Sequence, residues 1–204
     1  MHVSVIGVTQ PLIEPFSLDG LIEHAGRVCY NRTDSDGKNT AAFIKARLKE
    51  GHESIIEHCV ATFEITGISR ACSHQIVRHR ISSVSQESQR YVDMSECSFT
   101  VPPEIACDEE ALCIWNKALD MTQLAYRMLR RRGITKENAR MLLPQATQTR
   151  MVFTANFREL RHFFNMRCQK AAQWEIREVA KEMLRLMNDF TPNVFGDLYL
   201  KYCG

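Results

Sequence analysis

Residues 69–91, SRACSHQIVRHRISSVSQESQRY, gather side chains that can bind phosphate groups and the polar edges of ring compounds. The segment holds four arginines and two histidines against a single acid, Glu87, and hydroxyl and amide side chains crowd residues 82–88. Arginine binds phosphate in a bidentate manner, and hydroxyl and amide groups complete such sites. The alternative is that the arginines are solvated charges at a helix end. A solvated basic face usually alternates with acids, and residues 69–86 contain none, so the composition favours a ligand site.

The spacing within this segment predicts more than one binding partner for its arginines. We expect residues 70–80 to form a helix of about three turns that begins after an N-capping serine. On that helix Gln75, Arg78 and His79 share one face, whereas Arg80 lies about 200° around the axis from Arg78. One small anion cannot contact both arginines. The spacing therefore predicts two ligands, two phosphate groups, or one ligand and a second subunit.

A second basic cluster follows Asn156. Its members are Arg158, Arg161, His162 and Arg167, followed by Gln173, Trp174 and Glu175. Asn156 with Glu159 three residues later is a capping-box signature, so we expect the asparagine to begin a helix. A helix N-terminus also attracts anions, so a cap and a ligand contact at Asn156 are compatible.

The sequence lacks several motifs of other enzyme classes. His52 and His58 are six residues apart, whereas metalloprotease helices place histidines four apart, so we predict no zinc site and no other metal. Ser54 and Glu57 fit a capping box, and a ligand contact at Ser54 is equally open. No G-x-G pair marks a nucleotide-binding loop. The eight cysteines form no C-x-x-C pair and are predicted to be buried, reduced thiols.

The elements that must position these clusters follow from periodicity and capping. Alternating or β-branched segments predict strands over 2–8, 59–68 and 147–155. Amphipathic spacing and caps predict helices over 18–28, 40–50, 70–80, 108–132, 135–144, 157–168 and 172–190. Residues 84–94 are ambiguous, and residues 31–39 read as a polar loop. We find no repeat or linker, so the prediction is one α+β domain over residues 1–204 with more helix than strand.

Composition bounds the class of protein. The 204 residues are 45% hydrophobic and 25% charged, which is typical of a globular protein with one core. Lys and Arg number 26 against 24 Asp and Glu, and the net charge of +2 argues against nucleic-acid binding by overall charge. No basic and apolar leader begins the chain, and no apolar run approaches about 20 residues. We therefore expect a cytoplasmic protein with no membrane segment and no nucleic-acid partner.

The R-H-R triplet at 78–80, followed by seven residues and Ser88, resembles the R-H-R-x7-S signature of the flavin-dependent thymidylate synthases, the ThyX family. GHESIIEH at 51–58, ARMLLP at 139–144 and AQWEI at 172–176 resemble further blocks of that family in the same order. The resemblance implies an α+β homotetramer that binds FAD between subunits. It also implies conversion of dUMP to dTMP, with 5,10-methylenetetrahydrofolate as the carbon donor and NADPH as the reductant.

The resemblance also assigns roles to individual residues. The residues implied in FAD binding are Ser54, Arg78, His79, Arg80, Gln86, Asn156, Arg158 and His162. Those implied in dUMP binding are Gln75, Arg78, Gln86, Glu87, Ser88, Gln89, Arg90, Arg140 and Arg167. Arg167 is the implied catalytic residue, because its protonated guanidinium beside the uracil N3 would favour ionisation of N3 and make C5 more nucleophilic. No activating base lies at catalytic spacing from Ser88, so we assign its hydroxyl to phosphate binding.

The chain departs from the family pattern at three positions. Gln86 stands where many members have glutamate, and it keeps hydrogen bonding but not charge. His162 and Ala171 replace an asparagine and a histidine of some members. The alternative to an enzyme is a non-catalytic nucleotide- or RNA-binding module that uses the Arg/His-rich helix, but few aromatic side chains accompany the arginines. A phosphoester hydrolase would need clustered carboxylates or an activated nucleophile, and the sequence offers neither.

Overall fold

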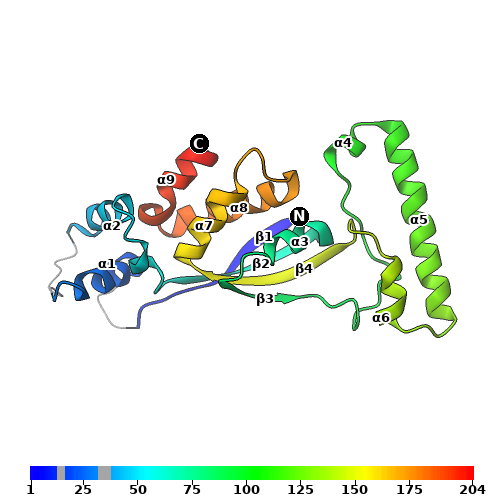
Figure 1. The fold of residues 1–204 in the computed structure, drawn as a ribbon, viewed down its shortest axis with the longest axis horizontal. Helices are drawn as coiled ribbons and strands as arrows, with labels where there is room; N and C mark the ends of the chain where they lie inside the picture. The colour runs from blue at the N-terminus through cyan, green and yellow to red at the C-terminus, as the bar shows by residue number, and fades with distance from the viewer. Residues whose placement is uncertain (13–16, 32–37) are drawn as a thin grey trace. The chain divides into compact units, whose positions relative to one another are not determined.

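The computed structural model describes residues 1–12, 17–31 and 38–204. Four strands form one sheet in the order β1-β2-β4-β3 (Figure 1). They are β1 His2–Val8, β2 Val60–Ser69, β3 Ser82–Gln86 and β4 Gln148–Asn156. Side chains along β2 and β4 alternate between buried and more accessible positions, which follows from the period-two pattern of their apolar residues. The predicted polar loop over 31–39 lies for the most part outside the described residues.

The chain divides into two compact units. The first unit comprises Met1, 66–76 and 85–151, and the second unit comprises 2–65, 77–84 and 152–204. Strands β2, β3 and β4 contribute residues to both units, so each unit is discontinuous in sequence. The single domain over 1–204 remains a prediction.

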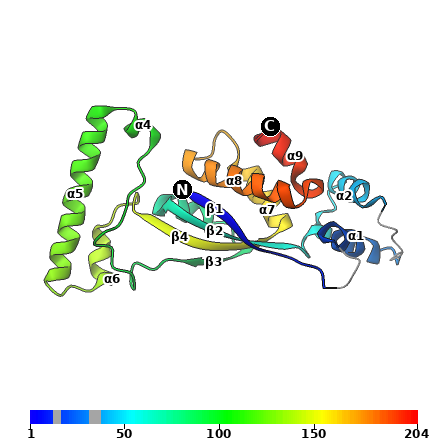
Figure 2. The ribbon, with the colours of Figure 1, turned by 180° about the vertical axis from the view of Figure 1, so that it is seen from behind.

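Helices make up much of the second unit. They are α1 Leu18–Val28, α2 Thr40–Lys49, α7 Phe157–Arg167, α8 Trp174–Phe190 and α9 Pro192–Tyr202, with the short 3-10 helix η1 Glu53–Ile56. Helix α8 packs against β1, α7 and α9, and two opposite views show α7 and α8 on the same face of the sheet (Figures 1 and 2). Between these helices the buried ring of Phe195 makes edge-to-face contacts with Phe157 and Phe164.

Helices and loops make up most of the first unit. The helices are α3 Arg70–Ile76, α4 Pro103–Ala106, α5 Glu109–Arg131 and α6 Lys136–Ala139, followed by the 3-10 turn η2 Arg140–Leu142. A small core is built around Met94 and Tyr126, where the Tyr126 hydroxyl accepts a hydrogen bond from the Met94 N–H at 3.2 Å. The Asp108 side chain accepts hydrogen bonds from the N–H groups of Glu110 and Ala111, so it caps α5.

Most of the predicted elements are confirmed to within two residues at each end. The α+β class with more helix than strand is also confirmed. Ser17 caps α1, since its Oγ accepts a hydrogen bond from the Gly20 N–H at 3.0 Å. In the part of the chain that the structure describes, no helix combines the length and the hydropathy that crossing a bilayer requires.

Three predictions about helices are wrong. The helix predicted over 70–80 ends at Ile76. The helix predicted over 135–144 is a single α-helical turn, α6, followed by η2. Helix α9 follows directly after α8, although we predicted no helix there. Pro192 is typical of a helix end, but proline is equally suited to the first turn of a helix, and this is the position it takes. The ambiguous residues 84–94 complete β3 at Gln86 and then form a loop.

The cysteines are free thiols, as predicted, but they are not all buried. Cys29, Cys107 and Cys113 are exposed, because each lies near the end of a helix or on its solvent side rather than in the core. Burial raises the pKa of both Cys59 and Cys168 to about 12, so these two thiols stay protonated at neutral pH.

Candidate functional site

The triplet of Arg78, His79 and Arg80 lies after α3, not on it. Val77 is 42% exposed and Ile81 is 70% exposed, so this segment offers no apolar face that packing could hold in a helix. The angle of about 200° that a helix would place between the two arginines therefore does not apply. Instead His79 is buried, and the arginine on each side of it is exposed.

The buried imidazole of His79 lies between a carboxylate and a guanidinium of α7. Its Nδ1 is 3.0 Å from Glu159 Oε1, and Arg167 Nε donates a hydrogen bond to its Nε2 at 3.0 Å. The ring also meets Phe163 edge-on and lies 5.7 Å from the ring of His162. Burial lowers the pKa of His79 below 6.5, and together with the charge of Arg167 it outweighs the opposing hydrogen bond to Glu159. The imidazole is therefore neutral at pH 7.

The same histidine belongs to a group with metal-ligand chemistry. His79, Glu159 and His162 place ligand atoms within 4.8 Å of one another. Both ring nitrogens of His79 take part in hydrogen bonds, so a metal ion would have to displace Glu159 or Arg167. The hydrogen bonds account for the grouping, and we assign no metal to it.

A cavity of about 670 Å³ in the second unit collects several of the residues predicted to bind FAD. It is lined by Glu53, Glu57, Ile81, Asn156, Arg158, Glu159 and His162. Arg158 donates a hydrogen bond to Glu57, and its Nε is 3.8 Å from Glu53 Oε2. The guanidinium of Arg158, the imidazole of His162 and the amide of Asn156 therefore line one cavity, and the carboxylates of Glu53 and Glu57 lie beside the guanidinium.

The two capping boxes that the sequence predicts, at Asn156 with Glu159 and at Ser54 with Glu57, have different outcomes. Asn156 caps α7, since its Oδ1 accepts a hydrogen bond from the Glu159 N–H at 2.9 Å. The Glu159 carboxylate, however, is bonded to His79, so the box is only half formed. Ser54 lies inside η1 rather than at its start, which is His52, so the box predicted for Ser54 and Glu57 is wrong. Ser54 is an exposed residue of the second unit.

Arg161, which the sequence places in the same basic cluster, has a structural role. Its guanidinium forms a bidentate pair with Asp197, with both distances 2.7 Å, and it also donates to the carbonyl of Val194. Burial disfavours the charge of Asp197, but the hydrogen bond and charge of Arg161 outweigh burial and lower the pKa of Asp197. The pair joins α7 to α9 and accounts for this arginine without a ligand.

A smaller cavity of about 200 Å³ in the first unit collects cationic side chains. It is lined by Arg70, His74, Gln89, Arg140, Met141, Leu143, Pro144 and Gln145. Burial lowers the pKa of Arg70, and the like charge of Arg140 lowers it further. A bound anion would relieve this repulsion, so the cavity is suited to an anionic group. The sequence predicts Gln89 and Arg140 as ligands but misses Arg70 and His74, although both lie in the basic segment.

Two glutamines predicted as ligands are anchored within the first unit. Gln86 Nε2 donates hydrogen bonds to Ser73 Oγ at 2.8 Å and to Thr149 Oγ1 at 3.3 Å. Gln75 on α3 reaches back to the carbonyl of Ala71 at 3.5 Å. The amide of Gln86 thus makes use of its NH₂ group, which a glutamate at this position would lack.

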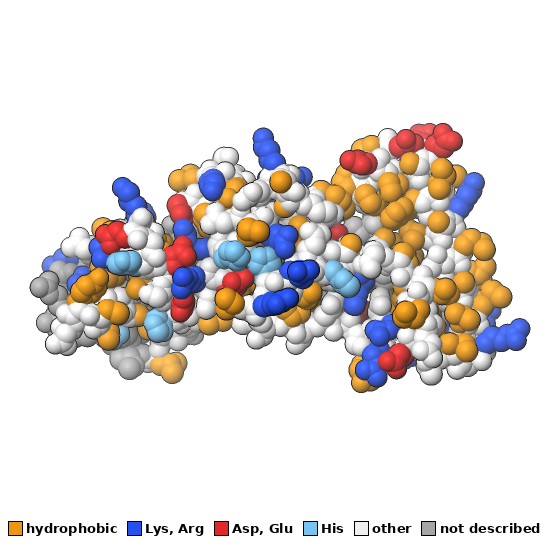
Figure 3. Space-filling view, viewed as in Figure 1, with side chains coloured by type: hydrophobic (Ala, Val, Ile, Leu, Met, Phe, Trp, Pro, Cys, Tyr) orange, Lys and Arg blue, Asp and Glu red, His pale blue; other side chains and the backbone are white. Residues whose placement is uncertain are grey.

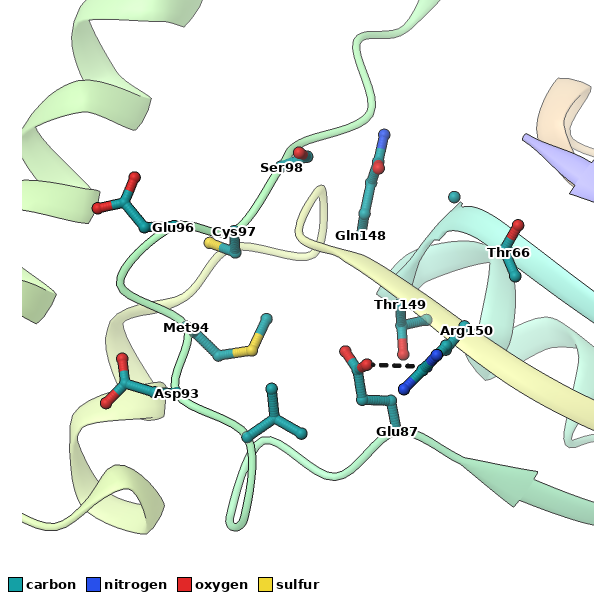
Figure 4. Close-up of a pocket in the computed structure, with 12 residues that line it drawn as sticks. Thr66, Glu87, Asp93, Met94, Glu96, Cys97, Ser98, Gln148, Thr149 and Arg150 are labelled. Atoms are coloured by element: carbon teal, nitrogen blue, oxygen red, sulfur yellow. Dashed lines mark ion pairs between the residues drawn. The ribbon is translucent and has the colours of Figure 1, made fainter.

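The residues that follow Gln86 form a loop of ion pairs and turns. Glu87 and Arg150 both line a cavity of about 290 Å³ and point toward one another, with 3.1 Å between their charged atoms (Figure 4). Arg90 pairs with Glu137 at 3.0 Å and is exposed. Ser88 Oγ accepts a hydrogen bond from the Arg90 N–H, which is a turn contact and not the geometry of an activated nucleophile.

The predicted site residues fall into two groups, one in each unit. The second unit holds Ser54, Arg78, His79, Arg80, Asn156, Arg158, His162 and Arg167. The first unit holds Gln75, Gln86, Glu87, Ser88, Gln89, Arg90 and Arg140.

Comparison with known proteins gives one consistent result. Residues 12–193 match the family model Thy1, described as thymidylate synthase complementing protein. A flavin-dependent thymidylate synthase of Geobacter sulfurreducens is 43% identical over 182 residues, which cover 85% of this chain and 78% of the relative. One of Pyrococcus abyssi is 47% identical over 192 residues, covering 90% and 78%. One of Mycolicibacterium vanbaalenii is 39% identical over 223 residues, covering 97% and 89%.

Proposed function

This chain belongs to the family of thymidylate synthase complementing proteins and catalyses flavin-dependent synthesis of thymidylate from dUMP and a folate; we propose that its flavin is FAD, its carbon donor 5,10-methylenetetrahydrofolate and its reductant NADPH. The non-catalytic nucleotide- or RNA-binding module is not favoured, because the match to named enzymes covers most of the chain.

The observation that carries the proposal is the pair of arginines, Arg70 and Arg140, around one small polar cavity. The phosphate of a nucleoside monophosphate is dianionic near neutral pH, and two guanidinium groups match its charge and its planar sets of oxygens. Gln89 lines the same cavity and is only 8% exposed, so its amide can complete the set. We therefore assign the dUMP phosphate to this cavity, with Ser88 and Arg90 on the adjoining loop.

The residues of the second unit fit a flavin dinucleotide. The cavity of about 670 Å³ lies within the range of ligand pockets, roughly 300–1,000 Å³. Asn156, Arg158 and His162 offer it the amide, cationic and imidazole groups that a pyrophosphate and a polar ring system require. FAD would be held there, with Arg78 and Arg80 as further cations. Bound FAD would supply the transfer of hydride and of the carbon unit. The guanidinium of Arg158 would then contact the pyrophosphate of FAD in place of the Glu57 carboxylate.

The chain's own contribution to catalysis is electrostatic. We assign it to Arg167, because an arginine guanidinium is planar and carries a delocalised positive charge. Contact with the uracil N3 and a neighbouring carbonyl would stabilise the N3 anion and raise electron density at C5. Ser88 takes no covalent part in this scheme, because its hydroxyl serves the turn at Arg90.

A homotetramer is supported by an apolar stripe on α5. Its members are Ile114, Met121, Leu124 and Met128, each between 47% and 65% exposed. At 100° per residue they span only about 80° of the helix surface. Apolar side chains also gather over α5 in the space-filling view (Figure 3). An exposed apolar stripe of this kind is typical of a subunit interface, and we propose that it contributes to a tetramer with FAD bound between subunits.

Two measurements on purified protein test the proposal. We expect a yellow protein whose released cofactor is FAD rather than FMN, and NADPH-dependent dTMP formation from dUMP and 5,10-methylenetetrahydrofolate.

Arg70→Ala should raise the KM for dUMP about 10-fold or more, since it removes a charge-assisted hydrogen bond to phosphate. Arg177→Ala, which alters an arginine on α8, is the matched control. A colourless protein that neither binds added FAD nor forms dTMP would refute the function.

A further inference from the structure

The hydrogen bonds from Glu159 through His79 to Arg167 have a defined direction. The guanidinium of an arginine offers only donors, so Arg167 Nε donates and His79 Nε2 must be the acceptor. A neutral imidazole carries one proton, which therefore lies on Nδ1 and is donated to Glu159 Oε1. The carboxylate thus selects the tautomer that presents an acceptor to the guanidinium.

Burial makes this selection strict. His79 and Glu159 are each 7% exposed, so water has little access with which to replace either hydrogen-bond partner. The ring of Phe163 meets the imidazole edge-on, with 4.8 Å between ring centres, and restricts its rotation. Glu159 and Phe163 consequently hold His79 Nε2, the atom that accepts the hydrogen bond of Arg167, in one position.

We propose that Glu159 is a positioning residue of this enzyme, which acts through His79 to orient the guanidinium of Arg167. This role rests on the proposed function, in which Arg167 contacts the pyrimidine. Since both ring nitrogens of His79 are engaged by the chain itself, its contact with FAD falls to its backbone or to the carbon edge of its ring.

The cap of α7 does not explain the Glu159 carboxylate. A glutamate three residues after an N-cap can bond back to the cap residue and stabilise the helix start. Here the Glu159 N–H already bonds to Asn156 Oδ1, and the carboxylate is 3.0 Å from His79. A change of the Glu159 side chain therefore leaves the capping hydrogen bond in place and removes the contact with the imidazole.

Glu159→Ala and Glu159→Gln test the role in the FAD-loaded enzyme, by separate assays of anaerobic flavin reduction by NADPH and of dTMP formation. We expect Glu159→Ala to lower the kcat for dTMP formation about 10- to 100-fold, because small misplacements of a catalytic group have effects of this size. Flavin reduction should stay within about twofold of wild type, since it does not involve the uracil ring. Glu159→Gln should recover most of the rate, because its amide oxygen can still accept the Nδ1 proton.

A buried glutamate elsewhere in the second unit provides the matched control. Glu23 on α1 is 2% exposed and accepts a hydrogen bond from Arg27 Nε at 2.8 Å. Glu23→Ala should lower stability without a selective loss of dTMP formation. In an Arg167→Lys background Glu159→Ala should add less than about twofold, since both changes disturb the same group.

The outcomes that oppose the inference are distinct from failure of the function. A Glu159→Ala enzyme that forms dTMP within about twofold of wild type, while Arg167→Lys is impaired, refutes the positioning role alone. The same holds if Glu159→Gln is as impaired as Glu159→Ala, or if Glu159→Ala loses both half-reactions equally. A wild-type protein that forms no dTMP refutes the function and with it this role.

Discussion

The neutral imidazole of His79 makes the stability of the folded chain depend on pH. Its folded-state pKa lies below 6.5, so the unfolded chain takes up a proton at this residue at a higher pH than the folded chain does. The stability that neutral His79 contributes is complete above pH 6.5 and is lost as the pH falls from 6.5 toward the folded-state pKa. Glu159, Arg167 and His162 are the titratable or charged groups that face the ring.

Urea unfolding of the wild type and of His79→Gln, from about pH 7.5 to about pH 5, measures this contribution. Relative to the variant, the wild type should lose up to about 1.4 kcal/mol of unfolding free energy per pH unit in the acidic part of the range. The other histidines titrate in both proteins and cancel in the difference. Parallel curves would contradict a lowered pKa at His79.

At the residue scale the sequence predicts the cations of the site better than their partners. Arg78 and His79 stand out by type and spacing, and the family resemblance singles out Arg167 from the second basic cluster. Glu159 does not stand out, because in the sequence its place three residues after Asn156 already fits a capping box. Its contact with His79 joins residues 80 positions apart in the chain, and such a contact follows from packing rather than from local spacing.

The helices of the first unit allow a direct comparison of two N-caps. Asp108 accepts hydrogen bonds from two N–H groups of α5, both at 3.0 Å, whereas Thr135 at the start of α6 forms no side-chain cap bond within the described part of the chain. Asp108→Ala should therefore cost about 1 kcal/mol of unfolding free energy, and Thr135→Ala only a few tenths. Urea titrations of both variants test the difference. Equal losses would mean that the cap bonds of α5 contribute nothing measurable.

The same contrast explains which elements the sequence predicts. Helix α5 has a strong cap and a long apolar period, and its prediction is confirmed. The end of α3 depends on whether the side chains of Val77 and Ile81 are buried in a core, and both are exposed. The start of α9 depends on whether Pro192 ends one helix or begins another. Local propensity permits both outcomes, and tertiary packing decides between them.

At the scale of the whole molecule, the apolar stripe on α5 predicts assembly. Met121→Asp places a charge within the stripe and should shift the proposed tetramer toward smaller species, because a buried unpaired charge is strongly unfavourable. Sedimentation velocity measures the shift. If FAD is bound between subunits, flavin content should fall with it.

Asn116→Asp provides the control for this experiment. Asn116 is exposed on α5 but lies outside the stripe, so the same new charge should leave assembly unchanged. Equal dissociation in both variants would assign the effect to net charge rather than to the stripe. A tetramer that persists in Met121→Asp would place the interface elsewhere.

The discontinuity of the two units has a consequence for how the chain is made. Residues 2–65 are synthesised well before α7, α8 and α9, which complete the second unit. Until they emerge, the buried side chains of β2 such as Phe63 and Ile65 lack part of their cover. Exposed apolar surface of this kind invites aggregation and chaperone binding. We therefore expect a nascent chain that stalls before residue 152 to be a substrate for quality control, because its core strands are already made and cannot yet be buried.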